Sequence, residues 1–278
     1  MTDDSTDAPT EDLLTKVENG VLWITLNRPD AANAITPDQR NRTIELLQTA
    51  SADLHVRAVV LTATGTRFCT GADLRAVQPP GPARPADAPD RATGDVARMI
   101  ATGAQRLVAA VLDCEKPVIA AVNGTAAGIG AHLALAADLV IAADTAKFIE
   151  VFVRRGIAPD AGGAWLLPRI VGLHKAKELI FFGDDLLAGD ALELGIVNKV
   201  VPFDELEAAT REWAERLAIG PTKAIGLSKA LLNRSFESDR AAAFADEAMV
   251  QELVMTTHDA NEGVAAFRER RDVAFKGW

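Results

Sequence analysis

Apolar residues recur along the chain with two periods, and short apolar runs mark the strands. Two such runs, Leu13–Val17 and Val21–Leu26, flank the dipeptide Asn19-Gly20, which is a strong short-range signal for a β-hairpin. Continuous apolar runs bounded by turn residues follow, and these are typical of strands buried on both faces. We expect such strands at Arg57–Thr62, Pro117–Val122, Asp138–Ala143 and Ile196–Val201.

A period of three to four residues marks the helices. Thr36, Pro37 and Gln39 combine an N-cap, a proline at the first helical position and a capping-box glutamine, so a helix should run from there to about Ala50. Strands and helices alternate up to Pro202, which indicates an α/β fold. The other helices of this part are expected at residues 90–113, 128–137, 165–170, 175–182 and 188–194.

Beyond Pro202 the pattern is helical only, with helices expected at residues 205–217, 222–232, 241–256 and 262–271. We therefore expect an α/β core at residues 13–202 and a C-terminal helical region at residues 203–278. The apolar stripes of that region need a surface to bury against, either the core or a neighbouring subunit. Residues 1–12 are predicted to be a disordered acidic tail, and the proline-rich segment 78–89 a mobile surface loop.

Composition narrows the classes of protein to consider. The net charge of −10 argues against nucleic acid or an anionic membrane as the main partner. The apolar stretch from Val118 to Ala143 is interrupted by Asn123, His132 and Asp138, so we do not expect it to span a membrane. Two cysteines do not make a disulfide framework, no cluster has metal-ligand spacing, and the acidic start is unlike a signal peptide. We expect a cytoplasmic protein without a metal.

The stretch VNGTAAGIGAHLALAADLVIAAD, from Val122 to Asp144, contains a glycine-rich turn. Gly124, Gly128 and Gly130 match the glycine turn of short-chain dehydrogenases, with Asp144 where a ribose-binding acid would stand. About 120 residues of α/β pattern precede the turn, however, whereas a dinucleotide-binding domain normally begins with it. The chain also contains no tyrosine, the residue with which those dehydrogenases protonate a carbonyl. A dinucleotide site is therefore the weakest hypothesis.

A second glycine-containing turn, GTRFCTGADL from Gly65 to Leu74, also follows a buried strand. Glycine frees the backbone for close approaches that a side chain would block. Two such turns can each supply a backbone N–H to one oxyanion hole, which stabilises charge that develops on a carbonyl or thioester oxygen. An N–H at the start of the helix near Gly128 would also gain from the helix dipole.

Several ordered motifs carry a resemblance to a known family. They are LNRPDAANAI, GTRFCTGADL, KPVIAAVNGTAAGIGAHLALAADLVIA, AKF, RGIAPDAGGAWLLPRIVG, AxELGIVNKVV and EGVAAFRERR. With these motifs the chain resembles the enoyl-CoA hydratase/isomerase (crotonase) superfamily from about Leu22 to Lys276. The resemblance implies a crotonase-like ββα spiral core and an acyl-CoA substrate, with coenzyme A as part of the substrate and no separate cofactor. It also implies a trimer, or a hexamer of two trimers.

By the same resemblance, the oxyanion donors are the backbone N–H groups of Ala72 and Ile129. Arg28 and Arg75 are candidate phosphate partners, or else solvated surface charges. The last helix and tail, Phe267 to Lys276, are candidates to reach the adenine end of coenzyme A. The segments that bind coenzyme A in the family correspond here to Asp30, Ala31, Ala32, Ala72, Asp73 and Leu74.

The family's hydratases use two glutamates, and both are replaced here. The corresponding positions carry His132 and Phe152, and a phenylalanine can neither accept nor donate a proton, so we expect Phe152 only to contact the substrate. Asp160 lies in a PDAGG turn similar to that of the family's isomerases, in which the aspartate moves the proton. The alternative for Asp160 is a helix N-cap. His132 is either a second acid/base or a hydrogen-bonded core residue, and Glu150 is the reserve acid because it would share a face with Phe152 in an extended segment.

The expected reaction is double-bond isomerisation of an enoyl-CoA, with Asp160 as the proton shuttle. Hydration, with His132 or Asp160 in place of the missing glutamates, is the first alternative. A non-catalytic acyl-CoA binder is an alternative of another class.

Overall fold

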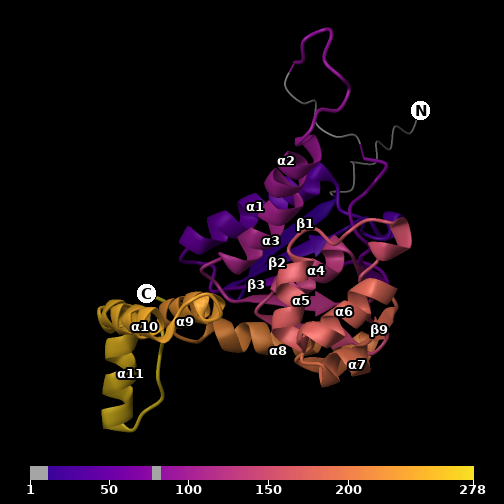
Figure 1. Cartoon of the computed structure of the whole chain (residues 1–278). Coiled ribbons are helices and arrows are strands. Elements are labelled where there is room, and N and C mark those ends of the chain that lie inside the picture. The colour runs from indigo at the N-terminus through magenta and orange to yellow at the C-terminus, as the bar shows by residue number, and fades with distance from the viewer. Residues whose placement is uncertain (1–11, 77–82) are drawn as a thin grey trace, which may run out of the picture.

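The computed structural model describes residues 12–76 and 83–278 (Figure 1). Its largest element is a six-stranded sheet of order β1-β2-β3-β5-β7-β10. All neighbours in it are parallel except β1, which pairs antiparallel with β2. The strands are β1 (Leu13–Glu18), β2 (Val21–Leu26), β3 (Ala58–Ala63), β5 (Val118–Val122), β7 (Leu139–Ala143) and β10 (Lys199–Val201).

The expected hairpin and buried strands are confirmed. Asn19 and Gly20 have φ values of 51° and 78°, the positive values that a tight hairpin turn of this handedness requires. Every residue of β5 is buried, as are nearly all of β2 and β7, because helices cover the sheet. The apolar run from 118 to 143 folds as strands and a helix, and no helix within residues 12–76 and 83–278 is both long and apolar enough to cross a membrane.

A second, four-stranded sheet of order β4-β6-β8-β9 was not foreseen from the sequence. Its strands are β4 (Arg67–Cys69), β6 (Thr125–Ala127), β8 (Lys147–Ile149) and β9 (Asp185–Leu187). β4, β6 and β8 are parallel, and β9 pairs antiparallel with β8. Because β4, β6 and β8 directly follow β3, β5 and β7 along the chain, the chain passes three times from the large sheet to the small one. This repeated passage is the spiral that the family resemblance implied.

The helices follow the expected order. The capping box at the start of α1 is complete, since Thr36 accepts from the Gln39 backbone and Gln39 accepts from the Thr36 backbone. The single helix expected at 90–113 is instead two, broken at Gly103, where a Cβ would lie 2.6 Å from the Met99 carbonyl. The α-helices of the core are α1 (Pro37–Ala52), α2 (Asp95–Thr102), α3 (Ala104–Leu112), α4 (Ile129–Ala136), α5 (Gly163–Val171), α6 (Leu173–Phe182) and α7 (Ala188–Glu193), with 3-10 turns at Pro29–Ala31, Val153–Arg155 and Phe203–Glu205.

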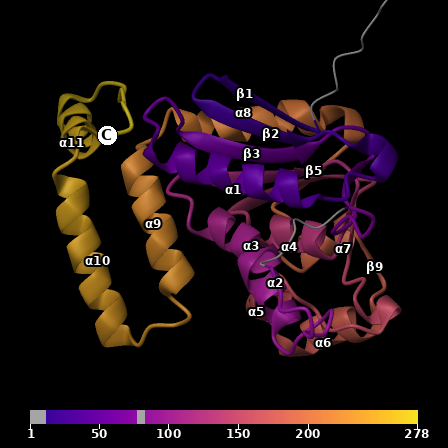
Figure 2. The same ribbon diagram turned by 90° about the horizontal axis from the view of Figure 1, so that it is seen from above.

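The C-terminal helices serve two different purposes. Helix α8 (Leu206–Ala218) packs on the large sheet against β3, β5 and β7. Helices α9 (Thr222–Arg234), α10 (Arg240–Met255) and α11 (His258–Glu269) form an arm that stands beside the core (Figure 2). The buried Lys229 of α9 fastens this arm, because its ammonium lies 2.8 Å from the Asp138 carboxylate and donates to the Val111 carbonyl.

Two segments that were predicted to lack regular structure contain residues that the structure does not describe. Residues 1–11 of the predicted acidic tail lie outside the described residues, and so do residues 78–82 of the predicted proline-rich loop. Asp12 is described, and its carbonyl accepts a hydrogen bond from the Gln39 side chain at 2.7 Å. Residues 83–89 contain no helix or strand.

Candidate active site

The candidate active site lies at one edge of the small sheet. Since β4, β6 and β8 are parallel, their carboxyl ends meet at the same edge. The segments that leave these ends are Thr70–Asp73, Gly128–Ile129 and Glu150–Phe152. The topology thus gathers residues from three distant parts of the chain, and each of the three segments contains a residue singled out from the sequence.

The two candidate oxyanion donors lie on neighbouring strand ends. Ala72 forms a bridge with Ile35 through the atoms on either side of it, since Gly71 accepts from Ile35 and Asp73 donates to Ile35. Its own N–H therefore points away from that bridge. Ile129 is the first residue of α4, where a backbone N–H has no partner within the helix. Gly130 keeps these segments close, because a Cβ there would overlap the Cys69 carbonyl.

His132 and Glu150 form a buried pair within hydrogen-bond distance. Nε2 of His132 lies 3.2 and 3.1 Å from the two carboxylate oxygens of Glu150. The His132 side chain is fully buried, and that of Glu150 is 6% exposed. Among residues 12–76 and 83–278, the other ring nitrogen of His132, Nδ1, has no hydrogen-bond partner. From the sequence the two residues are separate candidates, and their contact is not visible in the sequence pattern.

Phe152 lies where a second carboxylate would stand in a hydratase of the family. Its ring stacks on the His132 ring, with centroids 5.3 Å apart and an interplanar angle of 15°. Its ring also lies near Gly128, since a Cβ there would be 3.7 Å from the far end of Phe152. Glu150 and Phe152 thus both contact His132, although Val151 and Phe152 lie in a turn and the segment is not extended.

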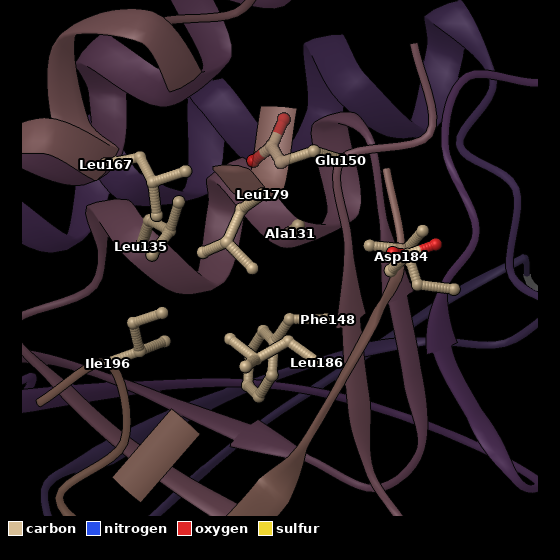
Figure 3. Close-up of a pocket in the computed structure, with 10 residues that line it drawn as sticks. Ala131, Leu135, Phe148, Glu150, Leu167, Leu179, Asp184, Leu186 and Ile196 are labelled. Atoms are coloured by element: carbon tan, nitrogen blue, oxygen red, sulfur yellow. The ribbon is translucent and has the colours of Figure 1, made fainter. Parts of the chain in front are cut away.

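Glu150 also borders a cavity of about 20 Å³, which has room for about one water molecule (Figure 3). Apart from Glu150 and Asp184, the residues around it are apolar. They are Ala131, Leu135, Phe148, Ile149, Leu167, Leu179, Leu186 and Ile196.

Asp160 lies in a tight turn that leads into α5. Ala161 and Gly162 both adopt left-handed φ values, of 50° and 82°, so the helix begins only at Gly163. Its N-cap is Gly162, with no side-chain hydrogen bond, and the alternative interpretation of Asp160 as the helix N-cap is therefore wrong. Burial raises the pKa of the Asp160 carboxyl, while the charge of His132 and the backbone N–H of Asp160 lower it. Asp160 is a half-buried acid that the helix end does not use.

Comparison with known proteins identifies the family. The family model described as Enoyl-CoA hydratase/isomerase matches residues 16–278. The chain belongs to the enoyl-CoA hydratase/isomerase family. It is 38% identical to the 1,2-epoxyphenylacetyl-CoA isomerase of Escherichia coli, over 96% of this chain and 99% of that protein. It is 34% identical to the crotonyl-CoA hydratase of Syntrophomonas wolfei, over 95% and 98% of the two chains.

Among solved structures of enoyl-CoA hydratase/isomerase family members, the enoyl-CoA hydratase of Bacillus anthracis superposes with a TM-score of 0.86 at 31% identity. The match covers 96% of this chain and all of that one. The crotonase-like α/β fold expected from the sequence is therefore confirmed. The names of the relatives include both an isomerase and a hydratase, so family membership establishes an acyl-CoA enzyme and leaves the reaction to be argued from the site.

The two arginines predicted as phosphate partners differ in their contacts and in their exposure. Arg28 is engaged within the protein, since its guanidinium donates to the Asp73 carboxylate and to the Ala34 carbonyl, each at 2.9 Å. Arg75 is 78% exposed and lies 3.5 Å from Asp73. The Arg75 backbone N–H, and then Arg28, lower the pKa of Asp73. The pair Arg28–Asp73 therefore joins the two segments expected to bind coenzyme A.

The remaining residues expected to bind coenzyme A lie in the same two segments. Asp30 and Leu74 are exposed, and Ala31 and Ala32 are half-buried at the 3-10 turn. Ala32 adopts a left-handed conformation with φ of 54°. Their role in binding coenzyme A stays a prediction.

The glycine-rich turn does not form the connection that a dinucleotide site needs. Gly124 lies between β5 and β6, so a further strand separates it from α4, and a Cβ there would overlap the Thr66 carbonyl. This strand is the physical reason that the three glycines do not bracket one strand–helix turn.

Burial raises the pKa of the neighbouring Cys69 thiol to about 11, which leaves it a poor nucleophile. No group of three or more metal-ligating side chains is found in residues 12–76 and 83–278.

Proposed function

We propose that the protein isomerises the double bond of an enoyl-CoA, with Asp160 as the proton shuttle. The observation that carries this proposal is the state of the acids beside the site. Glu150 is committed to His132, Phe152 has no titratable group, and Asp160 is half-buried and unused by the helix that follows it. One uncommitted carboxyl suits a reaction that moves a single proton from one carbon to another.

In the proposed mechanism the thioester oxygen accepts hydrogen bonds from the N–H groups of Ala72 and Ile129. Ionised Asp160 removes a proton from C-2 of a 3-enoyl thioester, and the electron pair moves into a dienolate whose negative oxygen those donors stabilise. The protonated Asp160 then returns the proton to C-4, which leaves the double bond conjugated with the thioester. The half-buried position of Asp160 raises its pKa toward the working range of a base that must also give its proton back.

Hydration is the second candidate. It requires one group to activate water and another to protonate the neighbouring carbon, and the family's hydratases use a pair of glutamates for these tasks. Here Asp160 and the His132–Glu150 pair would have to share them. The resemblance to a crotonyl-CoA hydratase keeps this candidate open, whereas the resemblance to an acyl-CoA isomerase and the aromatic ring at Phe152 favour isomerisation.

A direct test is to incubate the pure protein with 3-hexenoyl-CoA and, separately, with crotonyl-CoA in heavy water and to analyse both by mass spectrometry. Isomerisation converts 3-hexenoyl-CoA to the 2-enoyl product without addition of water. A gain of one water by crotonyl-CoA would establish a hydratase. Binding of both thioesters without turnover would instead indicate an acyl-CoA binder.

We further propose that the enzyme needs no separate cofactor, because coenzyme A is part of the substrate. We also propose that the enzyme is cytoplasmic and that it assembles as a trimer or a hexamer of two trimers. Cys69 and Cys114 are both free and buried, which fits a reducing compartment. The arm formed by α9 to α11 exposes large apolar side chains, among them Phe244, Met249 and Leu253, as expected of a surface that another subunit covers. The tail expected to reach the adenine end belongs to this arm.

A further inference from the structure

The His132–Glu150 pair is a costly feature that the fold does not require. It places two ionisable side chains in the interior, and His132 belongs to a helix whose other residues are Ile129, glycine, alanines and leucines. Burying a pair of charges costs about as much as their attraction returns, and an apolar pair of the same size would often be at least as stable. Within the described residues no group hydrogen-bonds to Nδ1 of His132, so the hydrogen bonds of the ring are at Nε2 alone.

The pair contacts the turn that carries Asp160, and it does so through the His132 ring. Gly163 packs on the His132 ring so closely that a Cβ there would overlap Nε2, the atom that contacts Glu150. Gly163 in turn donates its backbone N–H to the Asp160 carbonyl at 3.2 Å. Contacts therefore run without interruption from Glu150 through His132 to the turn of Asp160. Since Ala161 and Gly162 both have left-handed φ values, this turn needs support from its surroundings.

We propose that Glu150 and His132 together form a positioning pair for Asp160, with His132 supporting the Asp160–Gly163 turn and Glu150 stabilising a positive charge on the imidazole beside the shuttle. This inference rests on the proposed role of Asp160. The pair does not touch the reacting carbons in this account. It holds the carboxyl in place and opposes the effect of burial on its ionisation, so that Asp160 can act as a base in a largely apolar site.

The electrostatic part of the proposal has a defined sign. Burial raises the pKa of Asp160, and a positive His132 lowers it. The carboxylate 3.1 Å from Nε2 stabilises that positive charge. Within the described residues, His132 is the charged group that shifts the pKa of Asp160. The other titratable side chains on the elements around the turn are Glu150, Arg106, Arg154, Arg155, Arg169, His174, Lys175, Lys177 and Glu178, with Asp184 across the cavity from Glu150.

The test compares Glu150→Gln and His132→Gln with the wild type. His132→Gln takes away the imidazole and with it the positive charge that acts on Asp160, whereas Glu150→Gln leaves the imidazole without the carboxylate that stabilises this charge. The ionisation of Asp160 is followed by carbon-13 NMR of protein labelled at the aspartate carboxyls, with Asp160→Asn to assign the signal. We expect the midpoint to move to higher pH in both variants. We also expect kcat for 3-hexenoyl-CoA to fall about 10- to 100-fold with little change in KM, as for a misplaced catalytic group.

Asp138→Asn is the matched control, because it also neutralises a carboxyl of a mostly buried pair, just beyond the C-terminal end of α4 and away from Ile129. We expect it to lower the melting temperature without moving the Asp160 midpoint. An Asp160 midpoint that is the same in Glu150→Gln as in the wild type would overturn the positioning role.

The NMR measurement needs no turnover, so the two proposals can fail separately. A shifted midpoint in an enzyme that does not convert 3-hexenoyl-CoA would support the positioning pair and contradict the isomerase. An unshifted midpoint in an enzyme that Asp160→Asn inactivates would do the reverse.

Discussion

At the scale of single residues, the site depends on glycines, which leave room for their neighbours, as much as on residues with functional side chains. Gly163 leaves the space that the His132 ring occupies, and Gly130 lets α4 approach the end of β4. The His132 ring cannot easily move aside, because it is fully buried, stacked on Phe152 and bonded to Glu150. A methyl group at Gly163 would therefore have to displace the ring or the turn.

We expect Gly163→Ala to lower the free energy of unfolding by about 1–3 kcal/mol, the usual cost of overpacking a core. It should also reduce kcat by at least about 10-fold, because the Asp160 turn shifts. Gly189→Ala is the control, since a Cβ at Gly189 meets nothing within 4 Å and alanine is the better helix former. Urea denaturation and a turnover assay of both variants measure the two effects. Equal stability and activity in the two variants would show that the close packing at Gly163 does not matter.

The sequence predicted individual site residues better than their contacts. Asp160, His132 and Phe152 could be identified because ordered motifs place them at fixed positions. The contact between His132 and Glu150 could not, since it joins two residues 18 apart whose segments meet only when the small sheet forms. The engagement of Arg28 by Asp73 was likewise not visible, because it depends on two loops that are 45 residues apart in the chain.

At the scale of elements, most long and regular patterns were predicted correctly, apart from the helix expected at 90–113, and the strands of the small sheet were not predicted. The hairpin, the capping box of α1 and the C-terminal helices were all expected near their observed bounds. The four strands of the small sheet have three residues each, too few to show a period. Yet those strands place Ala72, Ile129 and Glu150 at one edge. The elements that build the site are thus the ones the sequence pattern shows least clearly.

The buried ammonium of Lys229 is one of the contacts that hold helix α9 to the core. Its side chain is 6% exposed and pairs with Asp138, whose pKa is raised by burial in spite of that partner. We expect Lys229→Met to lower the free energy of unfolding by about 3 kcal/mol, because it leaves Asp138 without its cation. Arg42→Met breaks the exposed pair Arg42–Glu45 and should cost less than about 1 kcal/mol. Similar losses for the two variants in urea denaturation would show that Lys229 does not anchor the arm.

At the scale of the whole molecule, the arm of α9 to α11 carries apolar side chains that the single chain does not bury. Helix α10 has no buried residue, although it carries a phenylalanine and two methionines. Met249 and Leu253 are 65% and 54% exposed and lie one turn apart, on the same side of the helix. Such a stripe is what the expected subunit contact would cover.

We expect the double variant Met249→Glu with Leu253→Glu to dissociate the proposed trimer or hexamer, because each glutamate would have to be buried in the contact. Leu54→Glu, at an equally exposed apolar position after α1, is the control and should leave the assembly intact. Light scattering coupled to size-exclusion chromatography gives the masses. A wild-type protein that elutes as a monomer would contradict the assembly.

The central claim is that Asp160 moves the proton of an enoyl-CoA isomerisation, and one comparison tests it most directly. Wild type and Asp160→Asn are each given 3-hexenoyl-CoA, and formation of the conjugated 2-enoyl product is followed by mass spectrometry together with ultraviolet absorbance. We expect turnover by the wild type and a loss of at least about 100-fold in the variant, since general acid–base groups contribute that much or more. Full activity of a folded Asp160→Asn variant, or no isomerisation by the wild type, would contradict the claim.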